Sequence, residues 1–344
     1  MPDAALSRPA RKERLRYGKS LRRKVSRATH AEWDPKRRDV SALELLQASE
    51  RGRVASLLLI KAARMAASPF GFYRGSVPVM AFDLSKLPST GLYAQLCGDA
   101  HVHNLGAFEG QDGRLIFDIN DFDETIRGPW EWDIKRMAGS LVLAGREAHN
   151  TEKECKVAAL AFVDSYQAAM WQFAGMPIVD LARYQVFRHL NVSPVLNVLR
   201  KAERATPVHN LEQLTEQLNK KWRFRDNKPL RFHVPPSTAN QVVAGLRNYV
   251  DTLLPERRHW FSDYRVEDVA FRVVGTGSVG TRDYIVLMFG PVKDDPLFVQ
   301  IKEERPSAYT QYLPKANGPL RDNVWPRGSA PCRCSQTSSS VGLR

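Results

Sequence analysis

The chain has 344 residues, of which 43% are hydrophobic and 26% charged, as in a globular protein of one large or two smaller domains. No run approaches the ~18 apolar residues that would span a bilayer, and the four Cys are too irregularly spaced for a disulfide framework or a zinc site. The net charge of +14 lies mainly at the ends, since residues 1–40 carry +8 and residues 315–344 carry +4. We therefore expect a cytoplasmic protein without a membrane partner, and the distribution of charge disfavours nucleic acid.

In chain order, the sequence predicts a basic arm, a middle part rich in helices and loops, and a final group of strands. Residues 1–40 are expected to form a solvated, mobile arm. An amphipathic helix begins after Ser41, where Glu44 completes a capping box, and Ser68-Pro69 ends it. Later elements are buried strands at 91–97 and 114–119, helices at 133–149, 152–173, 211–220 and 239–254, and an antiparallel meander at 269–274, 284–289 and 297–301.

The segment GDAHVHN (98–104) follows the first predicted strand. Its Asp99 and Asn104 stand five residues apart, which is the spacing of a phosphotransferase catalytic loop. In such a loop the Asp accepts the proton of the attacking hydroxyl, and the Asn helps to hold a magnesium ion. Asp99 is therefore a candidate base and Asn104 a candidate metal ligand.

The segment DINDFDE (118–124) places four carboxylates within seven residues, directly after the second predicted strand. Carboxylates so close together repel one another unless a cation neutralises them. Mg²⁺ is suited to this, because it takes carboxylate oxygens together with substrate phosphates. Asp121 and Asp123 are therefore candidate magnesium ligands. A solvated acidic loop is the alternative, which the apolar flanks disfavour.

Two further residues near these loops are candidates for supporting roles. Asp133 follows GPWEW (128–132) at the start of a predicted helix, so it is either a plain N-cap or a brace that accepts backbone N–H bonds from the loop of Asp99. Arg74, within FYRG (72–75), either contacts a phosphate or packs on the neighbouring aromatic rings.

A glycine-rich segment, GTGSVG, lies between two predicted strands of the meander. Because glycine has no Cβ, such a turn lets backbone N–H groups approach the phosphates of a nucleotide. A dinucleotide-binding motif would need a helix directly after the glycines, whereas residues 284–289 are strand-like. Lys302, on the following strand, has the form of a lysine that pairs with nucleotide phosphates. The candidate nucleotide-binding residues in the turn are Gly275, Gly277, Ser278 and Gly280. A simple hairpin turn is the alternative.

Together these tracts resemble a bacterial family known only as domain of unknown function 2252. The resemblance runs from about residue 15 to about residue 310 and rests on SPFGFYRG, CGDAHVHNLGAF, FDINDFDETIRGPWEWDIKR, VVGTGSVGTRDYIVL and VQIKEE. The motifs in turn resemble those of the protein-kinase-like superfamily, especially aminoglycoside-phosphotransferase-like enzymes. In those an Asp-Phe-Asp segment is followed by a Gly and then an Asp, at a spacing that Asp121, Gly128 and Asp133 match.

The resemblance implies a phosphotransferase that uses ATP and Mg²⁺ and acts on an unknown hydroxyl acceptor, either a small molecule or a protein. It implies a catalytic base at Asp99, magnesium ligands at Asn104 and Asp121, a loop brace at Asp133, and a phosphate clamp made by the glycine turn and Lys302. In a kinase the glycine loop precedes the catalytic Asp, whereas here it follows. We therefore infer a circularly permuted arrangement.

The expected fold is α+β, with a kinase-like, mainly helical lobe over residues 41–265 and a partial antiparallel β lobe over residues 266–314. A complete small lobe would continue with a helix and more strands after Lys302. Residues 315–344 are instead rich in Pro, Arg and Ser, and are expected to be disordered. A frameshift near residues 315–323 would explain this, so the chain is expected to be truncated and impaired as an enzyme.

Two other functions stay open. A metal-dependent hydrolase would use His101 and His103 as paired ligands, with Asp99, Asp118 or Asp121 completing the site. The remaining His lie in helical or loop contexts, and the repeat of a barrel is not seen. A non-catalytic nucleotide-binding module would bind nucleotide without hydrolysis or transfer.

Overall fold

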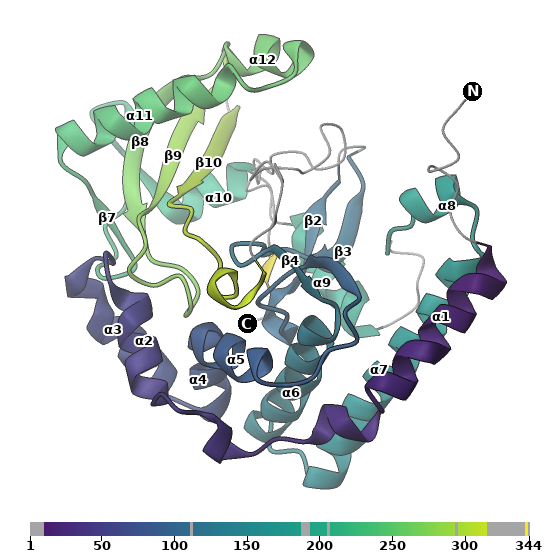
Figure 1. Cartoon of the computed structure of the whole chain (residues 1–344). Coiled ribbons are helices and arrows are strands. Elements are labelled where there is room, and N and C mark those ends of the chain that lie inside the picture. The colour runs from purple at the N-terminus through teal and green to yellow at the C-terminus, as the bar shows by residue number, and fades with distance from the viewer. Residues whose placement is uncertain are drawn as a thin grey trace.

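A computed structural model describes residues 10–110, 113–186, 193–204, 207–292, 295–314 and 341–342. Figure 1 shows an α+β protein in which a sheet covered by helices stands beside a larger, mainly helical part, as the predicted fold class requires. The helices are α1 (Arg11–Lys24), α2 (Ala42–Glu50), α3 (Ala55–Ala66), α4 (Pro69–Gly75), α5 (Val77–Ser85), α6 (Glu131–Glu147), α7 (Glu152–Gly175), α8 (Ile178–Ala182), α9 (Ser193–Arg204), α10 (Pro207–Leu214), α11 (Pro236–Val250) and α12 (Pro255–Phe261). The strands are β1 (Tyr93–Leu96), β2 (Leu105–Glu109), β3 (Leu115–Ile119), β4 (Ile126–Pro129), β5 (Thr215–Leu218), β6 (Lys221–Phe224), β7 (Arg231–His233), β8 (Arg265–Arg272), β9 (Asp283–Phe289), β10 (Pro296–Lys302) and β11 (Val341–Gly342).

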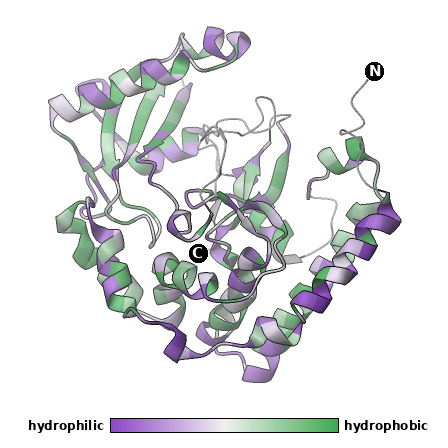
Figure 2. Cartoon of the chain, in the orientation of Figure 1, coloured by the Kyte–Doolittle hydropathy of each residue, from purple (hydrophilic) through white to green (hydrophobic). Residues whose placement is uncertain are grey.

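The four-stranded sheet has the order β10-β9-β8-β7 and is antiparallel throughout. This confirms the predicted meander and adds β7 at one edge. Successive side chains of β9 point to opposite faces, so Val286 and Met288 join a core formed with α11 and α12, while Ile285 and Leu287 join a core formed with α10 and β6. The hydrophobic character of these strands is visible in Figure 2. Helices therefore cover both faces of the sheet.

The sheet unit begins well before residue 265. Helices α10, α11 and α12 and strand β7 all precede that residue and pack or pair with the sheet. Residues on both sides of the predicted boundary between 265 and 266 therefore share one core. The predicted helix over 211–220 is wrong in its second half, because β5 and β6 form a hairpin there. Asn219 and Lys220, both with positive φ, make its two-residue turn.

The helix predicted from Ser41 to Ser68-Pro69 is divided into α2 and α3. Ser41 and Glu44 form the predicted capping box at the start of α2. The chain turns at Gly52, whose φ of +79° is the left-handed conformation that glycine adopts readily. The two helices therefore meet at a corner over residues 51–54, and Leu57 of α3 packs on Val279 near the end of the sheet.

Two small antiparallel pairs, β1 with β4 and β2 with β3, carry the loops of interest. Both strands predicted in this region, β1 and β3, are present. The loop after β1 and the loop after β3 lie on the side of the helical part that faces the four-stranded sheet (Figure 1). Helix α6, which was also predicted, begins directly after β4 and supports the first of these loops.

The N-terminal region is more structured than predicted. Arg11–Lys24 forms α1, with Leu21 buried, and Figure 1 shows it beside α7. The Arg11 guanidinium stands 5.9 Å from the centre of the Trp171 ring, and Arg38 pairs with Asp83. These contacts hold residues 11–38 against the helical part, although most basic side chains of α1 are exposed. The predicted disordered tail lies outside the described residues apart from β11, which pairs with β2. None of the described helices is long and apolar enough to cross a membrane.

Candidate functional site

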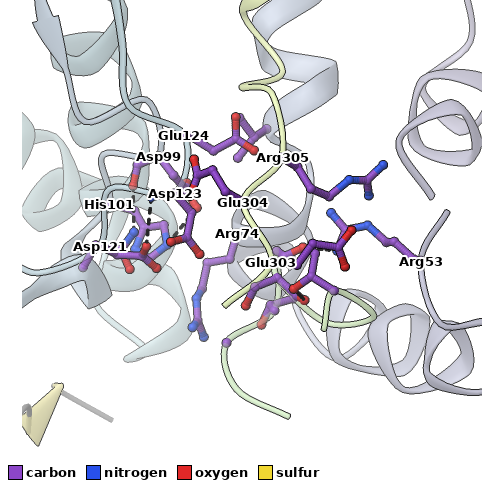
Figure 3. Close-up of a pocket in the computed structure, with 17 residues that line it drawn as sticks. Arg53, Arg74, Asp99, His101, Asp121, Asp123, Glu124, Glu303, Glu304 and Arg305 are labelled. Carbon is purple, nitrogen blue, oxygen red and sulfur yellow. Dashed lines mark hydrogen bonds and ion pairs between the residues drawn. The ribbon is translucent and has the colours of Figure 1, made fainter. Parts of the chain in front are cut away.

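A pocket lies between the loops of the helical part and the turn that joins β8 to β9. The space between these elements is about 740 Å³, including the solvent in its open mouth. Figure 3 shows Asp99, Asp121 and Asp123 on one side and Arg53 and Arg305 on the other, with Glu303 and Glu304 between them. The lining comprises Arg53, Arg74, Val77, Asp99, His101, Asn104, Asp121, Asp123, Glu124, Gly275, Thr276, Gly277, Ser278, Thr281, Glu303, Glu304 and Arg305. Segments nearly two hundred residues apart in sequence therefore meet here.

Asp99 occupies the floor of this pocket and is held by a buried arginine. Its Oδ1 accepts hydrogen bonds from Nε of Arg136 at 2.8 Å and from Nη2 of the same guanidinium. Arg136 is fully buried, and its guanidinium also lies 4.5 Å from the Tyr73 ring centre. Burial opposes the charge of Arg136, but the nearby Asp99 carboxylate outweighs this and raises the pKa of the guanidinium. Both hydrogen bonds use Oδ1, so Oδ2 is the oxygen available to the pocket.

The loop that carries Asp99 is fixed by Asp133. Its two carboxylate oxygens accept the backbone N–H groups of Cys97 at 2.7 Å and Gly98 at 3.0 Å. Gly98 has a φ of +82°, and a Cβ on it would stand 2.0 Å from the carbonyl oxygen of Glu124. Only glycine satisfies both conditions. Asp133 sits in the first turn of α6 and makes the contacts expected of a loop brace.

Asn104 and the acidic loop after β3 face the same space. The amide nitrogen of Asn104 donates to the backbone carbonyl of Asp99 at 2.9 Å, so the amide oxygen is the atom that could ligate a cation. Burial raises the pKa of Asp121 to about 6, and the Asp123 carboxylate beside it adds to the effect. A buried carboxylate with a second one nearby favours the binding of a cation.

Lys302 reaches the acidic loop from the end of β10. Its Nζ lies 3.3 Å from Oδ2 and 3.5 Å from Oδ1 of Asp123, which lines the pocket. Burial lowers the pKa of Lys302, but Asp121, Asp123 and Asp283 together outweigh it and raise the pKa. Lys302 is therefore a cation whose charge is directed at the acidic loop, and neither it nor Gly280 is among the residues that line the pocket.

The glycine turn closes the pocket opposite Asp99. A Cβ on Gly277 would lie 3.9 Å from Oδ2 of Asp99 and 3.2 Å from the carbonyl oxygen of Arg74. The backbone N–H groups of Thr276, Gly277 and Ser278 donate to no acceptor among the described residues. Unpaired amides in a glycine turn form a concavity that suits an anion. The carbonyl oxygens of Gly275, Gly277 and Val279, by contrast, accept hydrogen bonds from arginine side chains.

The remaining predicted residues are placed as follows. Arg74 lines the pocket from α4, and Figure 3 shows its side chain between the two walls. His101 is buried against Phe70, with its Nε2 3.6 Å from Oδ2 of Asp99, and burial lowers its pKa to about 4. The His103 ring also packs on Phe70, with its centre 6.5 Å from that of His101. The pair is thus engaged in aromatic packing.

The polar side chains of the pocket suit Mg²⁺ better than a metal ion whose ligands all come from the protein. Among the described residues, no three His, Cys, Asp or Glu side chains are arranged to hold a metal ion. Mg²⁺ needs fewer protein ligands, because it keeps several waters and is bound through one or two carboxylates plus substrate phosphates. The amide oxygen of Asn104 and the carboxylate of Asp121 supply such a donor set.

Sequence reasoning missed three arginines of this site, Arg53, Arg136 and Arg305. Arg136 stands three residues after Asp133, on the same side of α6, so helical periodicity could have drawn attention to it. Arg53 contacts a turn more than two hundred residues away, and no local pattern marks that contact.

The fold and the pocket define an α+β protein in which an acidic loop region of a helical part faces a glycine turn of an antiparallel sheet. A family model matches residues 53–323, and the chain belongs to that family, described as an uncharacterised protein conserved in bacteria (DUF2252). No curated protein and no solved structure matches the chain. The family predicted from the motifs is thereby confirmed.

Proposed function

We propose that the pocket is the active site of a phosphotransferase that uses Mg·ATP and acts on a hydroxyl acceptor. The observation that carries the proposal is the approach of the glycine turn to Asp99, with a Gly277 Cβ position 3.9 Å from Oδ2. Phosphoryl transfer needs a base beside the acceptor hydroxyl and donors along the phosphates, within one cavity. The resemblance to a circularly permuted kinase predicts the same juxtaposition.

The roles follow from the positions of the side chains. Oδ2 of Asp99 accepts the proton of the acceptor hydroxyl, while Arg136 holds Oδ1 and fixes the carboxylate plane. The free amides of residues 276–278 and the ammonium of Lys302 contact phosphate oxygens. Asn104 and Asp121 would hold Mg²⁺, which would neutralise phosphate charge. Asp133 keeps the loop of Asp99 in place through its two backbone hydrogen bonds.

Calorimetric titration with Mg·ATP tests the nucleotide site. The wild-type chain is expected to bind, and Asp121→Ala to bind at least about tenfold more weakly, since it loses a charged metal ligand. Asp118→Ala is the matched control, because Asp118 is an exposed carboxylate three residues away that does not line the pocket. No binding by the wild type, or equal binding by all three proteins, would contradict the proposal.

Chemistry is tested separately from binding. Asp99→Asn is expected to bind Mg·ATP but to lose transfer of the terminal phosphate to an acceptor, with water as the acceptor always present. If the wild type binds Mg·ATP and never transfers the phosphate to water or to any hydroxyl compound, the pocket belongs to a non-catalytic nucleotide-binding module.

A further inference from the structure

The carbonyl oxygens of the glycine turn are held from outside the sheet by the corner between α2 and α3. Nη1 of Arg53 donates to the carbonyl oxygens of Gly277 at 2.8 Å and Val279 at 2.7 Å, and its Nε donates to Ser49 at 3.2 Å. The next residue continues the contact, because the N–H of Val54 donates to the carbonyl oxygen of Gly280 at 2.7 Å. One short segment thus holds three carbonyl oxygens of the turn, those of Gly277, Val279 and Gly280.

The contact is close as well as hydrogen-bonded. Gly280 has a φ of +92°, and a Cβ on it would stand 3.1 Å from Cβ of Arg53, so a side chain at this position would be strained and would crowd the arginine. Val279 is almost fully buried between the strands and α3. The turn therefore has little freedom to shift towards or away from Asp99 while Arg53 is in place.

The same corner is tied to the chain that follows Lys302. Arg305 donates from Nη1 to the carbonyl oxygen of Ser49 at 3.1 Å and from Nη2 to that of Arg51 at 2.7 Å. Arg305 is three residues beyond Lys302, where β10 ends, so the corner also contacts the chain that leaves this strand. Figure 3 shows Arg53 and Arg305 together on the side of the pocket away from Asp99, Asp121 and Asp123.

We propose that Arg53 is a positioning residue for phosphate binding, a role that rests on the proposed function and names a further part of its machinery. Carbonyl oxygens near a phosphate repel it, whereas amide N–H groups attract it. By occupying two carbonyl oxygens, Arg53 removes that repulsion and holds the amides of residues 276–278 in the pocket. Nε and Nη1 of Arg53 are engaged with backbone oxygens, so these donors act on the nucleotide through the turn.

The test compares ligands with and without phosphates. The ratio of the dissociation constant of adenosine to that of Mg·ATP measures what the phosphates contribute, by calorimetry on the full chain. Arg53→Ala is expected to lower this ratio by about tenfold, as charge-assisted hydrogen bonds that order the turn are lost, and to leave adenosine affinity unchanged. Arg51→Ala, two residues away with an exposed side chain, is expected to retain the wild-type ratio.

Arg53→Lys separates positioning from charge. Lysine keeps the positive charge but lacks the planar fork of donors. We therefore expect Arg53→Lys to lower the ratio of the two dissociation constants nearly as much as Arg53→Ala does. In Arg53→Lys, amide hydrogen exchange should be faster than in the wild type in peptides spanning 274–282 and unchanged in β9. This measurement is also informative if Arg53→Ala folds poorly. A lysine variant with wild-type exchange and a wild-type ratio would overturn the role of Arg53. A wild-type ratio near one would instead overturn the proposed function itself.

Discussion

Gly98 shows how a single residue without a side chain determines the shape of the pocket. It combines a φ of +82° with a carbonyl oxygen of Glu124 at the place where a Cβ would be. Its N–H is one of the two held by Asp133, and Asp99 is the next residue. The position of the proposed base therefore depends on a backbone conformation that other residues rarely adopt.

We predict that Gly98→Ala lowers the free energy of unfolding by about 2 to 4 kcal/mol, because the methyl group adds a clash to the cost of positive φ. Gly91→Ala is the matched control. Gly91 has a φ of +76° and open space around its Cβ position, so only the conformational cost of about 1 kcal/mol applies. Urea denaturation of both variants measures the difference. Equal losses would show that the loop relaxes around the methyl group.

Among the elements, the segment 303–313 links the sheet to the helical part directly after Lys302. Tyr309 is almost fully buried and stacks on Trp132, with ring centres 5.2 Å apart. The carboxylate of Glu124 accepts the backbone N–H of Ala308 at 2.7 Å. Burial raises the pKa of Glu124 to about 7, although the Ala308 hydrogen bond acts in the opposite direction. The segment therefore docks on a group that titrates near neutral pH.

This docking predicts a stability that falls as pH rises. The folded-state pKa of Glu124 is raised from 4.5 to about 7, so the folded chain holds a proton that the unfolded chain has released. Its stabilising contribution is present in full below pH 4.5 and is lost as pH rises through 7. Glu124→Gln removes this titration. Between pH 4.5 and pH 8 the unfolding free energy of the wild type should therefore fall, relative to that of Glu124→Gln, by on the order of 2 to 3 kcal/mol.

Urea denaturation at several pH values between 5 and 8 measures this difference. The buried Asp121 and Asp283, with pKa values raised to about 6 by burial, act in the same direction. The unfolding free energy of Glu124→Gln should therefore depend on pH less steeply than that of the wild type, but it should still fall as pH rises. Parallel curves for the two proteins would mean that Glu124 titrates normally in the folded chain.

Elements were predictable where the signal is local. The meander follows from the short apolar runs at 284–289 and 297–301, and the start of α2 from its capping box. The break at Gly52 and the hairpin at Asn219-Lys220 were missed, because apolar spacing continues across a turn that only backbone conformation reveals. In the candidate site, the acidic and glycine motifs could be identified because they are short. Arg53 could not, since its partners come from the other end of the chain.

At the scale of the whole molecule, the pocket lies between two parts of the chain that contribute different groups to it. Lys302 and the amides of the turn belong to the sheet, and Asp99, Asn104 and Asp121 belong to the helical part. A ligand that contacts both parts stabilises the folded chain by mass action, by about 2.7 kcal/mol at a hundred times its dissociation constant. Thermal unfolding with and without nucleotide therefore reports on the pocket.

Removing magnesium should reverse the contribution of Asp121 to ATP binding, from favourable to unfavourable. Without Mg²⁺, the carboxylates of Asp121 and Asp123 repel the phosphates of ATP across the pocket. We predict that ATP in EDTA raises the melting temperature of the wild type less than Mg·ATP does. In Asp121→Asn the difference between these two shifts in melting temperature should be smaller, because the shift with Mg·ATP decreases and the shift with ATP in EDTA increases. Mg·ATP should bind the variant more weakly for want of a metal ligand, whereas magnesium-free ATP should bind it more tightly because one negative charge is gone. Asp118→Asn, on the exposed face of β3, should leave both shifts unchanged. A loss of affinity for both forms in Asp121→Asn would mean that the residue supports the structure of the pocket and does not bind a metal.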